Sequence, residues 1–191
     1  MTYVQCKDYI KSDYYRIKGS RQSNLFKLYY GTFFHVGFRF LFWFRLAKCS
    51  NILISTIARI MYFLVGQNHN IDIPRRTQIG YGFNIMHGGP CVISASACLG
   101  DNIDFGQYST IGSLYFNAAT IGNNVYIGPS VCIVENVHIG EGVTIGAGSV
   151  VVKDAVGGVT IAGNPAKVIS HKEPGRLIWR KWNRDWNNYK C

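Results

Sequence analysis

The middle of this 191-residue chain lacks basic side chains altogether. Between residues 77 and 152 there is no lysine or arginine, while four acidic residues give this stretch a formal charge of −4. The whole chain carries +10, so the two flanks together carry +14. A cation-rich surface therefore lies outside the middle, as a solvated face or as a site for an anionic membrane or a phosphate-bearing ligand. Nucleic-acid binding is disfavoured, because no recognised binding motif accompanies the charge.

Three further features are missing from the chain. Residues 1–13 contain no apolar signal-peptide core. The apolar run from Ile52 to Val65 is interrupted by Arg59 and is shorter than the roughly 20 residues of a membrane-spanning helix. None of the six cysteines forms a CxxC pair or clusters with histidine, as zinc ligands would. We therefore expect a cytoplasmic protein without a metal, and peripheral contact with the inner face of the membrane stays open.

Residues 1–70 have the apolar spacing of helices. The pattern predicts a short helix over residues 8–17 that ends at Gly19, a longer helix over residues 24–45 and another over residues 52–65. The second helix is apolar nearly all round, so it must be buried against the rest of the chain, another subunit or a membrane interface. The first interpretation is a helical cap on the following domain, and the alternative is membrane docking.

A hexapeptide repeat dominates the rest of the chain. Its apolar residues recur at intervals of six, apart from one interval of eight and one of ten, at Ile79, Ile85, Ile93, Leu99, Phe105, Ile111, Ile121, Ile127, Ile133, Ile139, Ile145 and Val151. Glycine often follows these residues, which suits tight corners. Such repeats form solenoids, in which three hexapeptides make one triangular coil of short parallel strands. Because Ile71 and Ile73 share the register, we predict a β-solenoid domain over residues 71–169.

The two irregular intervals mark loops that leave the solenoid, and functional residues are expected there. The eight-residue step, from Ile85 to Ile93, contains His87 in the sequence His-Gly-Gly-Pro. In the coil register Ile93 lies directly above Ile73, so the turn at His87 shares a corner with Asp72. Neighbouring strands are about 4.8 Å apart, which predicts that the Asp72 and His87 side chains lie within reach of each other.

A carboxylate beside a histidine makes a general base that can deprotonate a hydroxyl, because the carboxylate orients the ring and stabilises its positive charge. We therefore predict His87 as the catalytic base and Asp72 as its partner. The remaining histidines are less well placed for this role: His35, His69, His138 and His171.

Several motifs together resemble a known family. They are Ile79-Gly80-Tyr81-Gly82, Met86-His87-Gly88-Gly89, Ile145-Gly146-Ala147-Gly148-Ser149 and Ala162-Gly163-Asn164-Pro165-Ala166-Lys167. Through them the chain resembles the left-handed β-helix acyltransferases, and among these the serine acetyltransferase branch, in which the acid precedes the histidine by fifteen residues as Asp72 precedes His87. The resemblance implies a left-handed parallel β-helix. In a looser match, it places Asp13 near an acceptor-binding aspartate.

The resemblance further implies a homotrimer that binds acetyl-CoA in a groove between adjacent solenoids. By motif, Gly112, Pro129, Ala147 and Lys167 would line this groove, and the Lys167 cation suits a phosphate of the coenzyme. Direct acyl transfer then needs no metal, because His87 takes the proton of the acceptor hydroxyl and backbone N–H groups stabilise the oxyanion.

Two departures from the serine acetyltransferases bear on the acceptor. Met86 stands where that family has an aspartate that contacts the amino acid, and the ten-residue step, with Tyr115 and Phe116, contains no histidine. This pattern resembles the exopolysaccharide and capsule O-acetyltransferases of the same branch. The first hypothesis is therefore acetyl transfer to a sugar hydroxyl of a bacterial surface polysaccharide, with Asp13 and Met86 as acceptor contacts. Tyr115 and Phe116 would stack on a sugar or pack against another subunit.

Other functions remain as alternatives. Serine O-acetylation in cysteine biosynthesis is the alternative within the class, and a non-catalytic solenoid scaffold is the alternative outside it. A metalloprotein like the γ-class carbonic anhydrases is disfavoured, because its metal site needs three histidines and no three here share an edge. The basic tail, residues 170–191, carries Trp179, Trp182 and Trp186 at spacings that predict a short helix.

Overall fold

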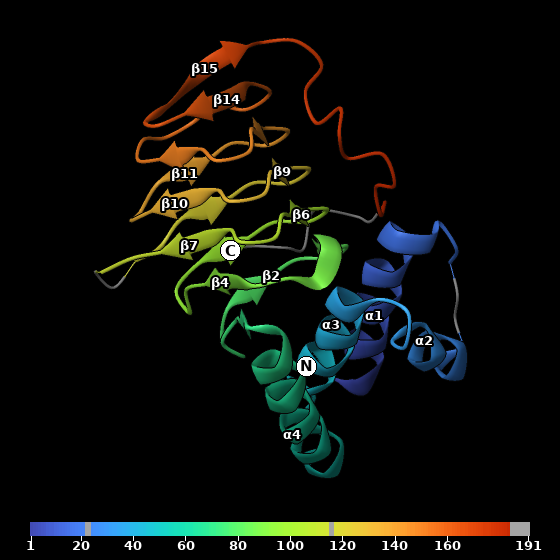
Figure 1. Ribbon diagram of the computed structural model, residues 1–191. Helices are drawn as coiled ribbons and strands as arrows, with labels where there is room; N and C mark the ends of the chain where they lie inside the picture. The colour runs from blue at the N-terminus through green and yellow to red at the C-terminus, as the bar shows by residue number, and fades with distance from the viewer. Residues whose placement is uncertain (22–23, 115–116, 184–191) are drawn as a thin grey trace.

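The computed structural model describes residues 1–21, 24–114 and 117–183 and shows a helical cap at one end of a β-solenoid (Figure 1). Four helices form the cap: α1 (Tyr3–Lys18), α2 (Leu25–Gly31), α3 (Val36–Leu46) and α4 (Ile52–His69). α3 packs against both α1 and α4, and α4 leads directly into the first strand. No helix in the described part of the chain is long and apolar enough to cross a membrane.

The first helix ends where the sequence predicts and begins earlier. Gly19 closes α1 at a φ of 69°, a left-handed conformation that glycine adopts at little cost. The helix starts at Tyr3 rather than near residue 8, because Thr2 and Gln5 form a capping box that satisfies two backbone N–H groups. The cap thus gains an additional turn of helix.

The single helix predicted over residues 24–45 is wrong, because the structure has two helices, α2 and α3, in this range. Arg39 of α3 reaches back and donates through Nε to the carbonyl oxygen of Thr32 at 3.0 Å, which holds the turn between the helices. A Cβ on Gly31 would lie 2.7 Å from the Tyr14 ring, so the end of α2 can approach α1 this closely only with glycine. The break lets α3 pack on the solenoid while α2 packs on α1 and α3.

Three sheets form the faces of the solenoid. The first contains β1 (Ile71–Asp72), β4 (Cys91–Ile93), β7 (Thr110–Gly112), β10 (Cys132–Val134) and β13 (Val150–Val151). The second contains β2 (Gln78–Ile79), β5 (Cys98–Leu99), β8 (Thr120–Ile121) and β11 (His138–Ile139). The third contains β3 (Asn84–Ile85), β6 (Asp104–Phe105), β9 (Tyr126–Ile127), β12 (Thr144–Ile145), β14 (Thr160–Gly163) and the antiparallel β15 (Ala166–Ser170). The predicted parallel β-helix is confirmed.

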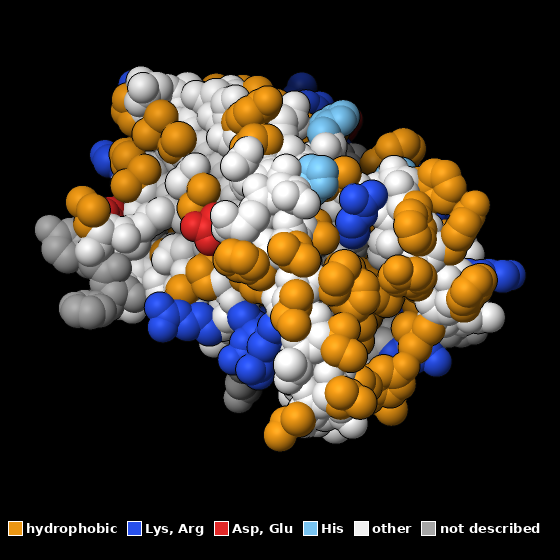
Figure 2. Space-filling model, turned by 60° about the horizontal axis from the view of Figure 1, so that its bottom comes forward, with side chains coloured by type: hydrophobic (Ala, Val, Ile, Leu, Met, Phe, Trp, Pro, Cys, Tyr) orange, Lys and Arg blue, Asp and Glu red, His pale blue; other side chains and the backbone are white. Residues whose placement is uncertain are grey.

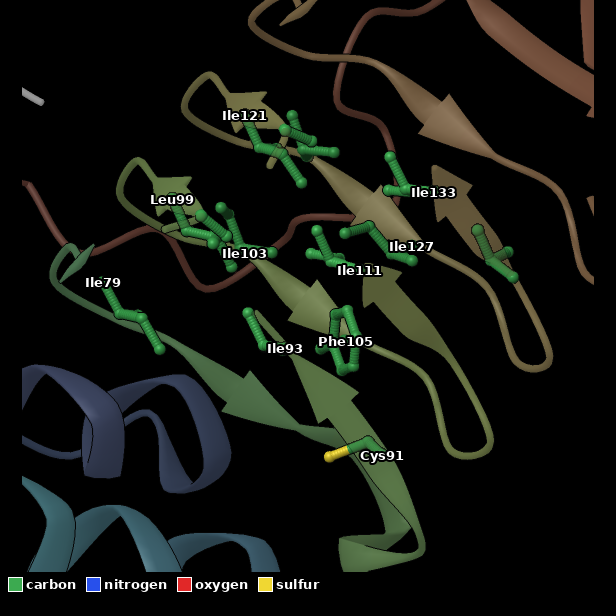
Figure 3. Close-up of a cluster of buried hydrophobic side chains, with 14 of the residues drawn as sticks. Ile79, Cys91, Ile93, Leu99, Ile103, Phe105, Ile111, Ile121, Ile127 and Ile133 are labelled. Carbon is green, nitrogen blue, oxygen red and sulfur yellow. The ribbon is translucent and has the colours of Figure 1, made fainter. Parts of the chain in front are cut away.

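The coils stack in the predicted register. In the second sheet, Ile79 pairs with Leu99, Leu99 with Ile121 and Ile121 with Ile139. Figure 3 shows the first three of these side chains pointing into the solenoid interior, where they meet apolar side chains of the other two faces. All four are at most 3% exposed. Because burying one such side chain contributes about 1.5–3 kcal/mol, these columns are the main source of solenoid stability.

A buried ion pair joins the cap to the solenoid. Arg45 of α3 donates through Nε to Asp13 Oδ2 of α1 at 2.9 Å and through Nη2 to Asp13 Oδ1 at 3.1 Å. The same guanidinium donates to the carbonyl oxygens of Ile79 (2.7 Å) and Gly80 (2.6 Å) in the first coil. Asp13 is 0% exposed and Arg45 is 1% exposed, so one charge without the other would be buried and uncompensated.

The described part of the C-terminal tail, residues 171–183, returns along the solenoid toward α1 (Figure 1). It contains turns in place of the predicted helix, and Trp186 lies outside the described residues. The Trp182 backbone N–H donates to Asn102 Oδ1 at 2.8 Å, and the Trp182 ring meets the Tyr15 ring edge-on. These contacts with distant elements take the place of hydrogen bonds within a tail helix.

Candidate active site

His87 lies in a single 3-10 turn, η1 (Met86–Gly88), at the first irregular corner of the solenoid. Its φ of 60° is left-handed, which costs roughly 1–2 kcal/mol for a residue with a Cβ. Gly88 is also left-handed, and a Cβ there would lie 2.6 Å from Val36 Cβ and 2.7 Å from the Gly37 nitrogen. The start of α3 therefore packs tightly on this turn and holds His87 in its strained backbone conformation.

The exposed side chain of His87 lines a pocket of about 790 Å³. The pocket lies where η1, the ends of α1 and α3, the outer side of the third sheet and the tail meet. Its lining residues are Arg16, Ile17, Phe34, His35, Val36, Gly37, Phe38, Asn84, Ile85, Met86, His87, Gly88, Asp104, Tyr126, Arg176, Leu177, Trp179 and Arg180. Its volume is typical of small-molecule sites.

A column of polar side chains on the third sheet forms one wall of the pocket. Asn84, Asp104 and Tyr126 pair in register on β3, β6 and β9. The Asn84 amide donates to Asp104 Oδ1 at 2.8 Å, and Arg16 Nη2 of α1 lies 2.7 Å from the same oxygen. Burial, and then the charge of Asp104, raise the pKa of Tyr126, so its phenol is a neutral hydrogen-bonding group at neutral pH.

Sequence reasoning missed this polar column, although the repeat contains its signal. Each of the three residues directly precedes an inward apolar residue of the third face, so it points outward from the coil. The sequence therefore contains enough information to predict that these three side chains form one outward surface beside the His87 corner. No local signal identifies Arg16, because its partner Asp104 is far away in the sequence.

The predicted contact between Asp72 and His87 is not in the structure. Among the ion pairs of the described residues, none joins these two side chains. Asp72 is exposed on β1, opposite Val92, and does not line the pocket. Burial raises the pKa of Tyr62, and the negative charge of Asp72 raises it further. Burial is also the larger cause, and the Asp72 charge the smaller cause, of the rise in the pKa of Cys91 to about 12. Asp72 thus acts on the outer side of the first face, whereas His87 lines a pocket on the third.

The two predicted acceptor contacts, Asp13 and Met86, have different outcomes. The prediction for Asp13 is wrong, because both its oxygens bind Arg45 and Oδ1 also accepts the Phe83 N–H at 2.9 Å. Asp13 is fully buried and does not line the pocket. Met86 does line it, directly beside His87.

Two of the predicted coenzyme residues, Pro129 and Ala147, share the corner of the solenoid that begins with the His87 turn. From the cap upward, this corner consists of residues 86–90, 106–108, 128–130 and 146–148. Its turns stack closely: the Gly148 N–H donates to the Pro129 carbonyl oxygen at 2.9 Å. Pro129 is half-buried and Ala147 is exposed, so both present surface along the same edge as His87.

The other two predicted coenzyme residues, Gly112 and Lys167, lie apart from each other. Lys167 is exposed on β15, where it pairs with Ala162 of β14. Ala162 lies close to the top of the His87 corner, because a Cβ added to Gly146 there would be 3.0 Å from the Ala162 Cβ. Gly112 ends β7 at the far end of the first face, opposite Val134. Within one chain the structure therefore groups Lys167, but not Gly112, with the His87 corner.

A second histidine, His35, lines the pocket at the start of α3. Its Nε2 is buried and has no hydrogen-bond partner within the described residues. Burial, and then the charge of Lys18, lower the pKa of His35, so the ring is neutral at neutral pH. No group of three His, Cys, Asp or Glu side chains that could hold a metal occurs in residues 1–21, 24–114 and 117–183. Tyr115 and Phe116 lie outside the described residues.

One protein family matches part of this chain. Residues 118–153 match the family described as bacterial transferase hexapeptide (six repeats). This segment therefore carries the hexapeptide repeat that the periodicity predicts. Over 124 residues it is 37% identical to serine acetyltransferase 1, chloroplastic, of Arabidopsis thaliana, a match that covers 63% of this chain and 40% of the relative. The chain thus spans less than half the length of that curated relative.

Solved serine acetyltransferases share the fold. Soybean serine acetyltransferase complexed with serine is 27% identical with a TM-score of 0.58, and the match covers 68% of this chain and 56% of that chain. The serine acetyltransferase of Brucella abortus strain S19 in complex with coenzyme A is 22% identical with a TM-score of 0.69, covering 87% and 68%. These likenesses confirm the resemblance to the serine acetyltransferase branch.

Proposed function

We propose that this chain is an acetyl-CoA-dependent O-acetyltransferase. The observation that carries the proposal is the position of His87, in a strained turn that lines a pocket of about 790 Å³. The turn interrupts a solenoid that is similar to serine acetyltransferases, among them one solved with serine and one solved with coenzyme A. A non-catalytic scaffold does not need a pocket of this volume beside an exposed histidine, so we place that alternative second.

In the proposed reaction, His87 accepts the proton of the acceptor hydroxyl while the hydroxyl oxygen bonds to the thioester carbonyl carbon. Backbone N–H groups stabilise the resulting oxyanion. Collapse of this intermediate breaks the C–S bond, and the departing coenzyme thiolate takes the proton back from His87. Asp72 stays the proposed orienting partner, because catalytic hydrogen bonds are often long in ligand-free structures and shorten in the substrate complex.

We further propose that acetyl-CoA lies along the solenoid corner that carries Pro129 and Ala147, with Lys167 near a coenzyme phosphate. These residues lie along the same edge as His87, which would bring the thioester toward the base. Gly112 lies at the other end of the first face, so it would reach the same coenzyme only from a neighbouring solenoid. A homotrimer, with a groove between adjacent chains, provides that arrangement.

The comparisons favour serine as the acceptor, since the solved and curated proteins similar to this chain are serine acetyltransferases. One observation keeps a sugar hydroxyl of a surface polysaccharide as the second candidate. Met86, rather than an acidic residue, stands beside His87 in a pocket whose volume greatly exceeds that of a serine molecule. An ammonium group would find no carboxylate at residue 86, whereas the apolar side chain and the nearby Trp179 and Phe34 suit the face of a sugar.

An acceptor screen that measures thiol release from acetyl-CoA tests both levels of the proposal. Turnover with L-serine supports the first candidate, and turnover only with glycan repeat units supports the second. Isothermal titration with coenzyme A accompanies the screen. If the chain neither binds the coenzyme nor releases thiol with any hydroxyl acceptor, the proposed acetyltransferase function is wrong.

A further inference from the structure

The outer side of α4 is an apolar stripe that no other described element covers. Leu53, Ile57, Ile60 and Leu64 recur at helical spacing and are 70%, 52%, 58% and 47% exposed. The opposite side of the helix packs on α3, and Ala58 on that side is only 1% exposed. Exposed apolar side chains that adjoin one another along a helix form a contiguous patch, which marks an interaction site.

A second exposed apolar group lies on α2 and the turn that follows it. Phe26, Tyr30, Phe33 and Phe34 are between 59% and 76% exposed. The two groups are linked through α3, where the Trp43 ring meets the Tyr29 ring of α2 edge-on and α3 packs along α4. Figure 2 shows hydrophobic side chains spread over this end of the molecule. We call this combined surface of α2 and α4 the cap face.

The cap face is set in the most one-sided charge region of the chain. Residues 14–71 contain eight lysines and arginines and no aspartate or glutamate. Arg16 and Arg45 are buried in ion pairs with Asp104 and Asp13, which leaves six cations without an ion pair of this kind in the described part of the chain. Lys27 on α2 and Arg59 on α4 are exposed beside the apolar residues. In Figure 2 blue side chains border the orange ones. The partner of this face must therefore accept apolar side chains and carry negative charge.

We propose that the cap face docks on an anionic lipid bilayer. Exposed aromatic and branched apolar residues beside Lys and Arg are typical of a surface that inserts shallowly among acyl chains and attracts lipid phosphates. A second copy of the chain is a poor occupant, because it would bring another acid-free surface against this one and the like charges would repel. α4 is not long and apolar enough to cross the bilayer, so it lies along the surface.

Docking in this way orients the pocket that contains His87. Phe34 belongs to the cap face, where it is 63% exposed, and it also lines the pocket. The cap face and the pocket therefore share an edge. A docked molecule would hold the pocket opening next to the lipid surface.

Flotation with lipid vesicles tests the proposal on the full chain. Vesicles of phosphatidylcholine with about one-quarter phosphatidylglycerol are compared with vesicles of phosphatidylcholine alone. The test variant is Leu53→Gln/Ile57→Gln/Leu64→Gln, in which glutamine keeps helix propensity while removing the apolar stripe. The matched control is Val92→Gln/Val152→Gln/Val156→Gln, which changes three exposed valines of the solenoid. Circular dichroism checks the folding of both, and light scattering gives their oligomeric state.

We expect the wild-type chain and the control to float with the anionic vesicles. The α4 variant should bind at least about tenfold more weakly, and about 0.5 M salt should weaken wild-type binding, because screening removes the contribution of the cations. Equal binding of the folded α4 variant, or no wild-type binding to anionic vesicles, overturns the proposal. If wild type does not float and the α4 variant forms a smaller oligomer, the cap face is an interface between copies of this chain. Should the triple variant fail to fold, Ile57→Gln alone against Val156→Gln decides the same question.

Discussion

The solenoid, residues 71–169, and the helical cap, residues 1–70, differ in how completely they bury their apolar side chains. In the solenoid the repeat positions are almost completely buried, as Leu99 and Ile121 show at 0% and 1% exposed. In the cap, α4 leaves Leu53 and Ile57 more than half exposed. The charge differs as well, because residues 77–152 contain no basic residue and residues 14–71 contain no acidic one.

This difference separates two tasks within one chain. The solenoid uses its apolar residues to stack coils, so its surface is free to carry the polar wall of the pocket at Asp104 and Tyr126. The cap uses only part of its apolar residues for packing and presents the rest. Arg45 is the point where the two regions depend on each other, since its guanidinium binds both Asp13 and the first coil.

The largest expected effect on stability comes from separating the two regions at their ion pair. Arg45→Met leaves the Asp13 carboxylate buried without its partner, so we expect the free energy of unfolding to fall by about 3–5 kcal/mol. Urea denaturation followed by circular dichroism measures it. The double variant Asp13→Asn/Arg45→Met should recover part of the loss. A loss below about 1 kcal/mol for Arg45→Met would show that the cap is not held on the solenoid by this pair.

A solenoid core residue is next in size. Leu99→Ala removes a fully buried side chain from the second-face column, and we expect a loss of about 2–5 kcal/mol. The same urea experiment measures this change. A loss of only a few tenths of a kcal/mol would mean that the column in Figure 3 packs far more loosely than the structure shows.

A pH dependence follows from Asp101, which is 1% exposed beneath the cap and accepts the Tyr81 N–H at 2.5 Å. Burial raises the pKa of Asp101 to about 7, although the Arg45 charge lowers it and the Asp13 charge offsets only part of that lowering. Burial has the largest effect. Between pH of about 4 and 7 the native state holds a proton that the unfolded state releases, so stability falls as pH rises through this window.

The expected slope for Asp101 is at most about 1.4 kcal/mol per pH unit. Asp101→Asn keeps the oxygen that accepts the Tyr81 N–H and removes the charge, so it should flatten the profile. Urea midpoints measured at several pH values provide the comparison. A wild-type stability that rises steadily with pH while the variant follows it in parallel would refute this account of Asp101.

The smallest expected effect on stability comes from a substitution in the cap that corresponds to the Leu99 substitution in the solenoid. Ile57→Ala alters an exposed side chain of α4, so we expect the free energy of unfolding to change by less than about 0.5 kcal/mol. A loss comparable to that of Leu99→Ala would show that α4 is buried in solution, in an oligomer or against another element.

The regular part of the fold was predictable because a hexapeptide repeat fixes which residues point inward and how successive coils stack. Ile79 under Leu99, and Ile85 under Phe105, follow from counting residues, and so does the corner at His87. The break between α2 and α3 was not predictable, since the apolar pattern runs through it. The turn depends on Gly31 approaching Tyr14, a contact between two different helices.

The site was predictable only at the level of backbone position. The register placed His87 and Asp72 at one corner, and the family resemblance added Pro129 and Ala147 by motif, but neither showed that Asp72 lies on the first face while the His87 pocket lies on the third. Asp13 was assigned to the acceptor, although its true partner Arg45 is 32 residues away on another helix. Such pairings depend on how helices pack in three dimensions, and periodicity along the chain does not encode that packing.

The central claim is that His87 is the base in an acetyl transfer, and the rate of thiol release from acetyl-CoA tests it most directly. His87→Ala is compared with His138→Ala, which removes an exposed histidine from the second face of the same solenoid. With the acceptor identified by the screen, and with both variants folded, we expect His87→Ala to lower kcat by about 10²–10⁴-fold and His138→Ala to match the wild type. If His87→Ala stays within about twofold of the wild type, His87 is not the base and the account of the site is contradicted.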